Sequence, residues 1–208
     1  MRTRTRIKFC GLTRPEDVDE AVALGVDMIG LVFAVQSPRR LELSVARQLR
    51  ERIPASIRTV ALFMDSPREQ IETSIAAVRP DVLQFHGQED EDFCTRFGLP
   101  YYKAMGMAGV RADDLTRQLA RWPSADALLL DGHAAGEPGG SGQGFDWQVL
   151  TGRNPPRFLL AGGLDAGNVT RAIELAQPWG VDVSSGIESS PGIKSTERMR
   201  AFVQAVRG

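Results

Sequence analysis

The sequence predicts an α/β protein whose parallel strands close into a single eight-fold (β/α)₈ barrel. Three observations support the barrel: short apolar runs alternate with helical patterns from end to end, eight such runs occur, and no Pro/Ser-rich linker interrupts them. Doubly wound open sheets usually have about five or six strands, so eight runs favour closure. The 208 residues lie near the lower limit for such a barrel, so we expect a single domain over residues 1–208 with few insertions.

The expected strands are short apolar runs separated by helical patterns, which is the order of βαβ units in a parallel sheet. They are Arg6–Cys10, Asp27–Phe33, Arg58–Phe63, Asp81–Phe85, Tyr101–Met105, Ala127–Asp131, Arg157–Ala161 and Val181–Ser184. A weak internal repeat supports pairs of βα units, because an aspartate follows a helix end at the start of strands two, four, six and eight. We interpret these acids as structural residues at the rim where strands begin: Asp27, Asp81, Asp126 and Asp182.

A helix is expected after each strand. The first, Pro15–Leu24, has Thr13 as its candidate N-cap and a proline and acidic residues in its first turn, as helix N-termini favour. A shorter turn is expected near Asp146. The remaining helical patterns are Ser44–Arg52, Pro67–Val78, Asp90–Phe97, Ala112–Arg121, Ala166–Ala176 and Thr196–Val206.

Composition excludes several classes of function. A net charge of −1 gives no reason to expect nucleic acid as a partner. No run approaches the roughly 18 apolar residues that span a membrane, and no apolar stretch of signal-peptide length follows the basic start of the chain. Two cysteines cannot form a disulfide framework, so we expect a soluble cytoplasmic protein. The sequence leaves a monomer or a homodimer open.

Polar side chains gather at the carboxyl ends of the expected strands, where barrel enzymes have their active sites. Period-two alternation puts Lys8 and Cys10 on one face of the first strand, and Gln84 and His86 on one face of the fourth. The sixth strand is aliphatic until it ends in Asp131. Each residue also has a structural interpretation: a buried thiol, a counter-ion, a turn histidine or a helix cap. Their joint position is what predicts a catalytic site.

Glycine- and serine-rich segments follow the sixth, seventh and eighth strands. Gly140, Ser141 and Gly142 lie in a long run from Gly132 to Gly144 that has no helical or strand pattern. The other members of the set are Gly162, Gly163, Ser184, Ser185 and Gly186. Exposed N–H groups in such loops bind phosphate, and barrels commonly use the loops after strands seven and eight for it. The segments therefore predict a (β/α)₈ barrel of the phosphate-binding type, and the alternative is a flexible linker with two tight turns.

Metal and dinucleotide chemistry lack the usual motifs. The two histidines have no HxH or CxxC spacing beside them, and Gly162-Gly163 lacks the third glycine of a dinucleotide-binding turn. We therefore expect no metal and no cofactor, and acid–base chemistry on a small phosphorylated substrate.

In this order, the motifs resemble the phosphoribosylanthranilate isomerase family of tryptophan biosynthesis, along nearly the whole chain. The segments that carry the resemblance are Lys8–Thr13, Gly30–Phe33, Ser37–Arg39, Leu83–Gly87, Leu129–Asp131, Gly139–Gly142, Phe145–Trp147, Leu160–Leu164 with Asn168-Val169, Val181–Glu188 and Pro191–Lys194.

The resemblance implies an Amadori rearrangement of N-(5-phosphoribosyl)anthranilate to 1-(2-carboxyphenylamino)-1-deoxyribulose 5-phosphate. Asp131 matches the general acid that opens the sugar ring, and Cys10 matches the general base that removes the C2′ proton. Arg39 matches the residue that holds the anthranilate carboxylate, although Arg40 stands where relatives usually carry an aromatic residue and is an alternative. The glycine and serine loops match the phosphate site.

A nearby charge is expected to tune the base, and an apolar environment is expected to tune the acid. A thiol must become a thiolate to act as a base, and our hypothesis is that the charge of Lys8 lowers the pKa of Cys10. Asp131 needs a raised pKa to act as an acid, and the aliphatic residues before it in the sixth strand would favour this. A further departure from the family is Ser195, where relatives more usually carry aspartate, and which we expect to affect a helix cap. No role is assigned to Asp65.

Three rival functions remain at this stage. An epimerase of this fold would need metal-ligating histidines, and an imidazole-ribotide isomerase would use an aspartate where Cys10 stands. A barrel that only binds a phosphorylated metabolite would keep the glycine loops and would not depend on Cys10. An isomerase of this kind should turn over its substrate without metal and should lose this activity when Cys10 or Asp131 is substituted. This result would separate it from all three rivals.

Overall fold

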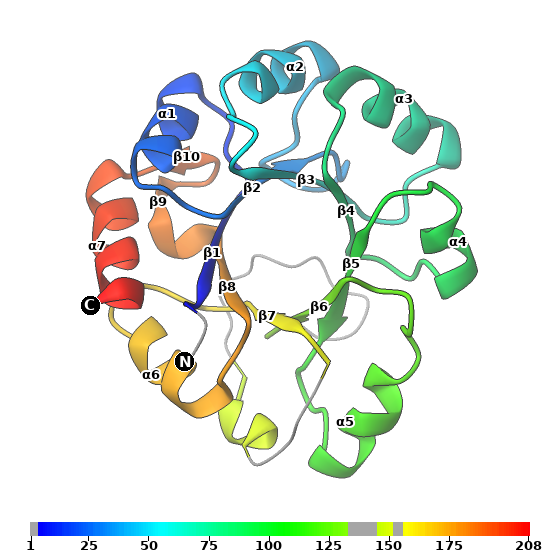
Figure 1. Cartoon of the computed structure of the whole chain (residues 1–208), viewed down its shortest axis with the longest axis vertical. Coiled ribbons are helices and arrows are strands. Elements are labelled where there is room, and N and C mark those ends of the chain that lie inside the picture. Colours follow the sequence, from blue (N-terminus) through cyan, green and yellow to red (C-terminus); the bar gives the residue numbers. More distant parts are fainter. Residues whose placement is uncertain (1–3, 133–144, 152–155) are drawn as a thin grey trace.

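The computed structural model describes residues 4–132, 145–151 and 156–208 and contains a closed barrel of eight parallel strands in sequence order. The last strand pairs with the first, and helices form a ring outside the strands (Figure 1). The strands are β1 (Arg6–Cys10), β2 (Met28–Val32), β3 (Arg58–Phe63), β4 (Val82–Phe85), β5 (Tyr101–Gly106), β6 (Ala127–Asp131), β7 (Phe158–Leu160) and β8 (Gly180–Val183). The predicted fold class is confirmed.

The outer helices follow the strands in order. They are α1 (Pro15–Ala23), α2 (Leu43–Glu51), α3 (Arg68–Val78), α4 (Glu91–Thr95), α5 (Ala112–Leu119), α6 (Val169–Ala176) and α7 (Thr196–Arg207). Two short 3₁₀ turns, η1 (Trp147–Leu150) and η2 (Ser185–Ile187), and an antiparallel pair of strands, β9 (Glu188–Ser190) and β10 (Ile193–Lys194), complete the described elements. In Figure 1 the β9–β10 hairpin lies between the start of α1 and α7.

Strand prediction was more accurate than helix prediction. β1, β3 and β6 have the expected bounds, and each other strand differs by one residue at one or both ends. Between β6 and β7, the shorter turn expected near Asp146 is confirmed: η1 begins directly after Asp146, which is its N-cap. α4 and α5 end earlier than expected because their last turns change to i→i+3 bonds, such as Arg96 N–H to Phe93 O at 3.3 Å and Arg121 N–H to Gln118 O at 3.3 Å.

The start of α6 is also later than expected, at Val169 instead of Ala166. Asp165 and Asn168 build a side-chain-capped turn before the helix: Asp165 Oδ1 accepts bonds from the N–H of Gly167 at 2.8 Å and of Asn168 at 3.1 Å. Asn168 Oδ1 in turn accepts from the N–H of Asp165 at 3.0 Å. Such local bonds compete with helix formation and delay it.

The predicted N-cap of α1 is wrong. Arg14 occupies the cap position and makes no capping bond with its side chain. The hydroxyl of Thr13 instead donates to the carbonyl of Gly192, in the turn between β9 and β10. Thr13 therefore joins the loop after β1 to the hairpin after β8.

Alternation along the strands separates the two faces of the barrel wall. Ile7 and Phe9 of β1 pack outward, in the large apolar cluster between the strands and the helices. Inward-facing residues fill the lower barrel as a second cluster: Met28, Val60, Val82, Tyr102, Ala104, Ala127, Leu129, Leu159 and Ala161. Because this cluster closes the interior below, inward side chains at the carboxyl ends of the strands are left to line a cavity.

Three of the four predicted rim aspartates lie just before their strands. Asp27 accepts from the N–H of Ile7 at 2.9 Å, and Asp81 accepts from the N–H of Thr59 at 2.7 Å. Asp126 pairs with arginines at that end of the barrel. The fourth assignment is wrong: β8 begins at Gly180, so Asp182 lies within the strand, opposite Lys8 in the register and inside the barrel.

No helix in the part of the chain that the structure describes combines the length and the apolar character needed to cross a bilayer.

Candidate active site

One cavity opens at the carboxyl ends of the barrel strands, and most of the predicted site residues border it. Its inner wall comes from barrel residues, and its outer wall comes from the loops after β2, β7 and β8. The lining residues are Cys10, Val32, Ala34, Gln36, Ser37, Pro38, Arg39, Leu62, Met64, Gln84, His86, Asp131, Ala161, Gly162, Gly163, Leu164, Asp182, Val183, Ser184 and Ser185. Both predicted catalytic residues are in this set.

Cys10 is a free cysteine at the end of β1, with 5% of its surface exposed. Gly30 of β2 lies opposite, and a Cβ atom there would be 2.8 Å from Cys10 Sγ, so glycine provides the space that the thiol occupies. Burial raises the pKa of Cys10; the charge of Lys8 opposes this, and the charge of Asp182 adds to it. The proximity predicted between Lys8 and the thiol is present, but its effect on the thiol pKa is outweighed.

Lys8 is fully buried beneath the cavity and is absent from its lining. Its Nζ lies 2.9 Å from Asp182 Oδ1. Burial lowers the pKa of Lys8, but the charges of Asp182 and Cys10 outweigh it and raise the pKa overall, so the lysine is protonated. Lys8 is thus the counter-ion of a buried carboxylate that itself borders the cavity.

Asp131 ends β6 across the barrel from β1, and 6% of its surface is exposed. His86 Nε2 lies 3.7 Å from Asp131 Oδ2, and His86 Nδ1 lies 3.3 Å from the amide nitrogen of Gln84. Gln84 is fully buried in β4 and contacts His86, as their predicted shared face requires. The structure therefore places His86 beside Asp131, the predicted acid, and Gln84 beside His86.

Arg39 lies in the loop after β2, where it borders the cavity and is 8% exposed. Its Nε and Nη2 donate to Glu188 Oε1 and Oε2, each at 2.7 Å. Arg40 is exposed on the outer surface, 3.9 Å from Glu42. The two candidate arginines therefore differ in position: Arg39 faces the cavity and Arg40 does not.

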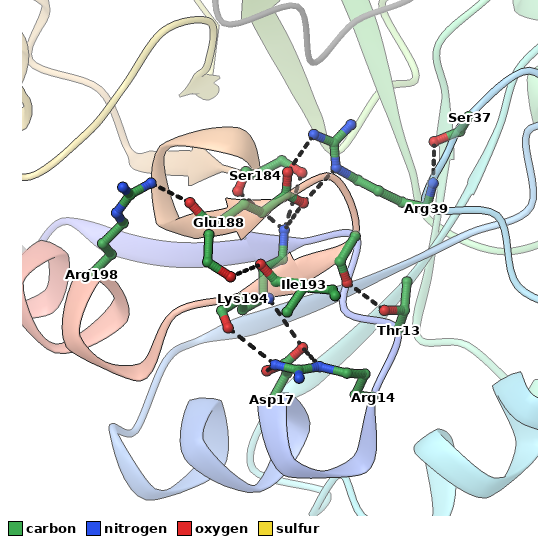
Figure 2. Close-up of polar contacts among 12 residues, drawn as sticks. Thr13, Arg14, Asp17, Ser37, Arg39, Ser184, Glu188, Ile193, Lys194 and Arg198 are labelled. Atoms are coloured by element: carbon green, nitrogen blue, oxygen red, sulfur yellow. Dashed lines mark hydrogen bonds and ion pairs between the residues drawn. The ribbon is translucent and has the colours of Figure 1, made fainter.

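Two charged residues behind Arg39 were not singled out from the sequence. Glu188 on β9 and Lys194 on β10 form an ion pair of 2.8 Å, and Lys194 Nζ also donates to Ser184 O at 3.1 Å (Figure 2). Burial would raise the pKa of Glu188, but hydrogen bonds from Arg39 and the charge of Lys194 lower it overall. Both residues follow the last barrel strand, where the rule about strand ends does not apply.

The glycine and serine segments that the structure describes meet at the cavity. Gly162 and Gly163 have φ angles of 83° and 63°, a conformation that favours glycine. A Cβ atom on Gly186 would lie 1.9 Å from the carbonyl oxygen of Leu164, so the loops after β7 and β8 touch. Ser184 and Ser185 line the cavity. Gly140, Ser141 and Gly142 lie outside the described residues.

Asp65, to which the sequence assigned no role, joins the loops after β3 and β4. Its Oδ1 accepts from the N–H of Gln88 at 2.6 Å, and its own N–H donates to Glu89 Oε1 at 2.8 Å. It has a positive φ of 48°. These bonds fix the segment that follows His86.

The cavity brings together a thiol, a carboxylate on the opposite wall, an arginine and glycine-rich loops. A thiol and a carboxylate on opposite walls allow one proton to be added and another removed on a substrate held between them. The arginine and the loop N–H groups suit a substrate with a carboxylate at one end and a phosphate at the other. Among the residues that the structure describes, no three His, Cys, Asp or Glu side chains form a metal-binding group.

Comparisons with known proteins agree on one family. The family model for N-(5'phosphoribosyl)anthranilate (PRA) isomerase matches residues 7–205. The N-(5'-phosphoribosyl)anthranilate isomerase of Stenotrophomonas maltophilia (strain R551-3) is 50% identical over 205 residues, which is 98% of this chain and 94% of that protein.

Solved structures agree. Phosphoribosyl anthranilate isomerase from Thermotoga maritima superposes with a TM-score of 0.87 at 32% identity, over 98% of this chain and 99% of that one. A phosphoribosyl anthranilate isomerase in complex with reduced 1-(o-carboxyphenylamino)-1-deoxyribulose 5-phosphate has a TM-score of 0.83 at 29% identity, with the same coverage of 98% and 99%.

Proposed function

Because the chain belongs to the N-(5'-phosphoribosyl)anthranilate isomerase family, we propose that it catalyses the Amadori rearrangement of N-(5'-phosphoribosyl)anthranilate by general acid–base catalysis. The chain is an enzyme, an isomerase of tryptophan biosynthesis. The proposal concerns the reaction and its mechanism: the substrate, a ribosyl aminal of anthranilate, becomes 1-(2-carboxyphenylamino)-1-deoxyribulose 5-phosphate without loss or gain of atoms.

Asp131 is the proposed general acid. It protonates the ring oxygen of the ribose, so that the C1′–O bond breaks and a Schiff base forms with the anthranilate nitrogen. Its place at the end of β6, 6% exposed and bordering the cavity, supports this role. Gln84 and His86 are proposed to bind the substrate beside it.

Cys10 is the proposed general base. Its thiolate removes the proton from C2′ of the Schiff base to give an enolamine, which then tautomerises to the ketone. Cys10 and Asp131 lie on strands β1 and β6, on opposite sides of the barrel mouth, so they reach the substrate from different sides. The charge of Lys8 favours this thiolate, although burial of the thiol and the charge of Asp182 outweigh it and raise the pKa of Cys10 overall.

The two anionic ends of the substrate have separate proposed partners. Arg39 binds the anthranilate carboxylate, because it is the cavity-lining arginine in the described part of the chain. Gly162, Gly163, Ser184, Ser185 and Gly186 bind the phosphate, together with Gly140, Ser141 and Gly142 from the segment that the structure does not describe. The observation that carries the whole proposal is a cavity that joins Cys10, Asp131 and Arg39 to the loops after β7 and β8.

Loss of the fluorescence of the anthranilate adduct tests the reaction. We expect Cys10→Ser and Asp131→Asn each to lower kcat by about 10² to 10⁴-fold, the usual contribution of an acid or base group. Cys94→Ala is the matched control, since Cys94 is also buried and free but packs in the outer apolar cluster. Retained turnover in both site variants would contradict the mechanism, whereas no turnover by the wild-type protein would favour a barrel that only binds a phosphorylated metabolite.

Further proposals concern the whole chain. We propose that residues 1–208 act as a single domain, without a cofactor, in the cytoplasm, on a small phosphorylated sugar as the partner. A monomer and a homodimer remain the two predicted states.

A further inference from the structure

We propose that Glu188 and Lys194 are positioning residues that fix Arg39 relative to Ser184, and so set the spacing between the carboxylate and phosphate ends of the substrate. This inference rests on the proposed function, in which Arg39 binds the carboxylate and Ser184 belongs to the phosphate site. Neither Glu188 nor Lys194 borders the cavity, so both act through residues that do.

The ion pair between Arg39 and Glu188 determines which edge of the Arg39 guanidinium is available to the substrate. A guanidinium carries five N–H donors in a plane. Glu188 binds the side edge, at Nε and Nη2, through two bonds of 2.7 Å. Among the described residues this leaves the end edge, formed by Nη1 and Nη2, for a second carboxylate in bidentate geometry. Figure 2 shows Arg39 reaching past Glu188 with this end edge directed away from the hairpin.

The stem of Arg39 is fixed as well. Gly11, with a φ of 72°, packs against it so closely that a Cβ atom there would lie 2.4 Å from Arg39 Cδ. The backbone N–H of Arg39 donates to Ser37 Oγ at 3.2 Å. Because the stem and one edge of the head group are both held, little rotamer entropy is lost when the substrate binds.

Lys194 connects this arginine to the other end of the site. Its Nζ donates to Glu188 Oε1 at 2.8 Å, to Ser184 O at 3.1 Å and to Ser184 Oγ at 3.3 Å. Its backbone is held by α1, since its N–H donates to Asp17 Oδ2 at 3.3 Å and its carbonyl accepts from Arg14 at 3.1 Å. The chain Arg39–Glu188–Lys194–Ser184 is therefore continuous and anchored outside the cavity.

The charges of these linked side chains also favour binding of one anionic group. Arg39 and Lys194 carry two positive charges and Glu188 one negative charge, so a single positive charge remains for the substrate carboxylate. A simpler role for Glu188 is to occupy Arg39 until the substrate displaces it. The two roles predict opposite results: removal of a competitor strengthens binding of the carboxylate, whereas removal of a positioning residue weakens it.

The test compares two ligands that differ only in the carboxylate. One is reduced 1-(o-carboxyphenylamino)-1-deoxyribulose 5-phosphate, and the other is the phenylamino compound without the carboxyl group. Calorimetric titration of the full chain gives both dissociation constants. We expect Glu188→Gln to raise the dissociation constant of the first ligand by about tenfold, since this ligand contacts Arg39. The dissociation constant of the second ligand should change by less than about threefold. The ratio of the two dissociation constants gives the preference for the carboxylate. Lys194→Met, which keeps the pair of Arg39 with Glu188, should lower this preference by a smaller factor.

Glu20→Gln is the matched control. It removes another bidentate pair, between Glu20 on α1 and Arg200 on α7 at 2.7 Å and 3.2 Å, in the outer ring of helices. We expect it to leave the preference for the carboxylate unchanged. The inference is overturned if Glu188→Gln retains or increases that preference.

Arg39→Met separates the inference from the function on which it rests. If that variant keeps the preference for the carboxylate, the assignment of Arg39 itself is wrong. If Arg39→Met loses the preference while Glu188→Gln and Lys194→Met keep it, the proposed function stands and only the positioning role is rejected.

Discussion

At the scale of single residues, Cys10 depends on two buried charges of opposite sign. Lys8 lowers the pKa of the thiol, and Asp182 raises it. We therefore predict that Lys8→Met raises the pKa of Cys10 and that Asp182→Asn lowers it. The rate of alkylation by iodoacetamide, followed from pH 6 to about 11, reports the thiolate fraction and hence this pKa.

A Cys94→Ala background makes the measurement specific. Cys94 is fully buried on α4, and burial raises the pKa of its thiol to about 12, so it would add a second, late titration. If both variants move the pKa of Cys10 in the same direction, the two charges do not act on the thiol as the geometry indicates.

Residues that alternate on a barrel strand could be predicted from the sequence, and residues of later loops could not. Cys10, Gln84 and Asp131 lie at strand ends, where period two and the direction of a parallel sheet fix the side of the wall that they face. Asp182 was misassigned because its strand begins earlier, at Gly180, which has no side chain to mark it. The contact of Arg39 with Glu188 spans 149 residues, and no local pattern carries such a pairing.

At the scale of elements, the same distinction separates strands from helices. Strands between two apolar layers are almost wholly buried, so their apolar runs have clear ends, as in β3 and β6. Helix ends depend on local bonds that several sequences satisfy equally well. The side-chain turn before α6 and the i→i+3 turns after α4 and α5 are such bonds, and the apolar periodicity does not reveal them.

The cap of α7 gives a prediction at this scale. Ser195 is its N-cap, and Oγ accepts from the N–H of Arg198 at 3.4 Å. We expect Ser195→Ala to lower the free energy of unfolding by about 1 kcal/mol, the usual value of a serine cap. Ser195→Asp should restore it, because an aspartate caps equally well and its charge suits a helix N-terminus.

Urea unfolding followed by circular dichroism measures both variants. An aspartate variant no more stable than the alanine variant would show that the hydroxyl does not cap α7. In that case the bond from Arg198 to the carbonyl of Glu188 would hold the start of the helix alone.

At the scale of the whole molecule, the barrel closes by joining the two ends of the chain. β1 pairs with β8 through a register that sets Lys8 beside Asp182. Outside the barrel, Arg200 of α7 pairs with Glu20 of α1, and Arg207 donates to the carbonyl of Leu24 at 2.9 Å. The hairpin after β8 adds the buried pair of Arg39 with Glu188 to this seam. Closure and the geometry of the site therefore rest partly on the same bonds.

The pH dependence of stability tests this link. The folded state lowers the pKa of Glu188, because bonds from Arg39 and the charge of Lys194 outweigh burial. The carboxylate thus binds a proton less readily in the folded state than in the unfolded state, so its stabilisation is full above the unfolded value of about 4.3 and is lost as the pH falls through the lower folded value. We expect Glu188→Gln to cost about 3 kcal/mol at neutral pH, as breaking a buried ion pair does. Urea unfolding of both proteins should show this difference narrowing as the pH falls below about 4.3, the unfolded value; a difference independent of pH would mean that the charge of Glu188 does not contribute to closure.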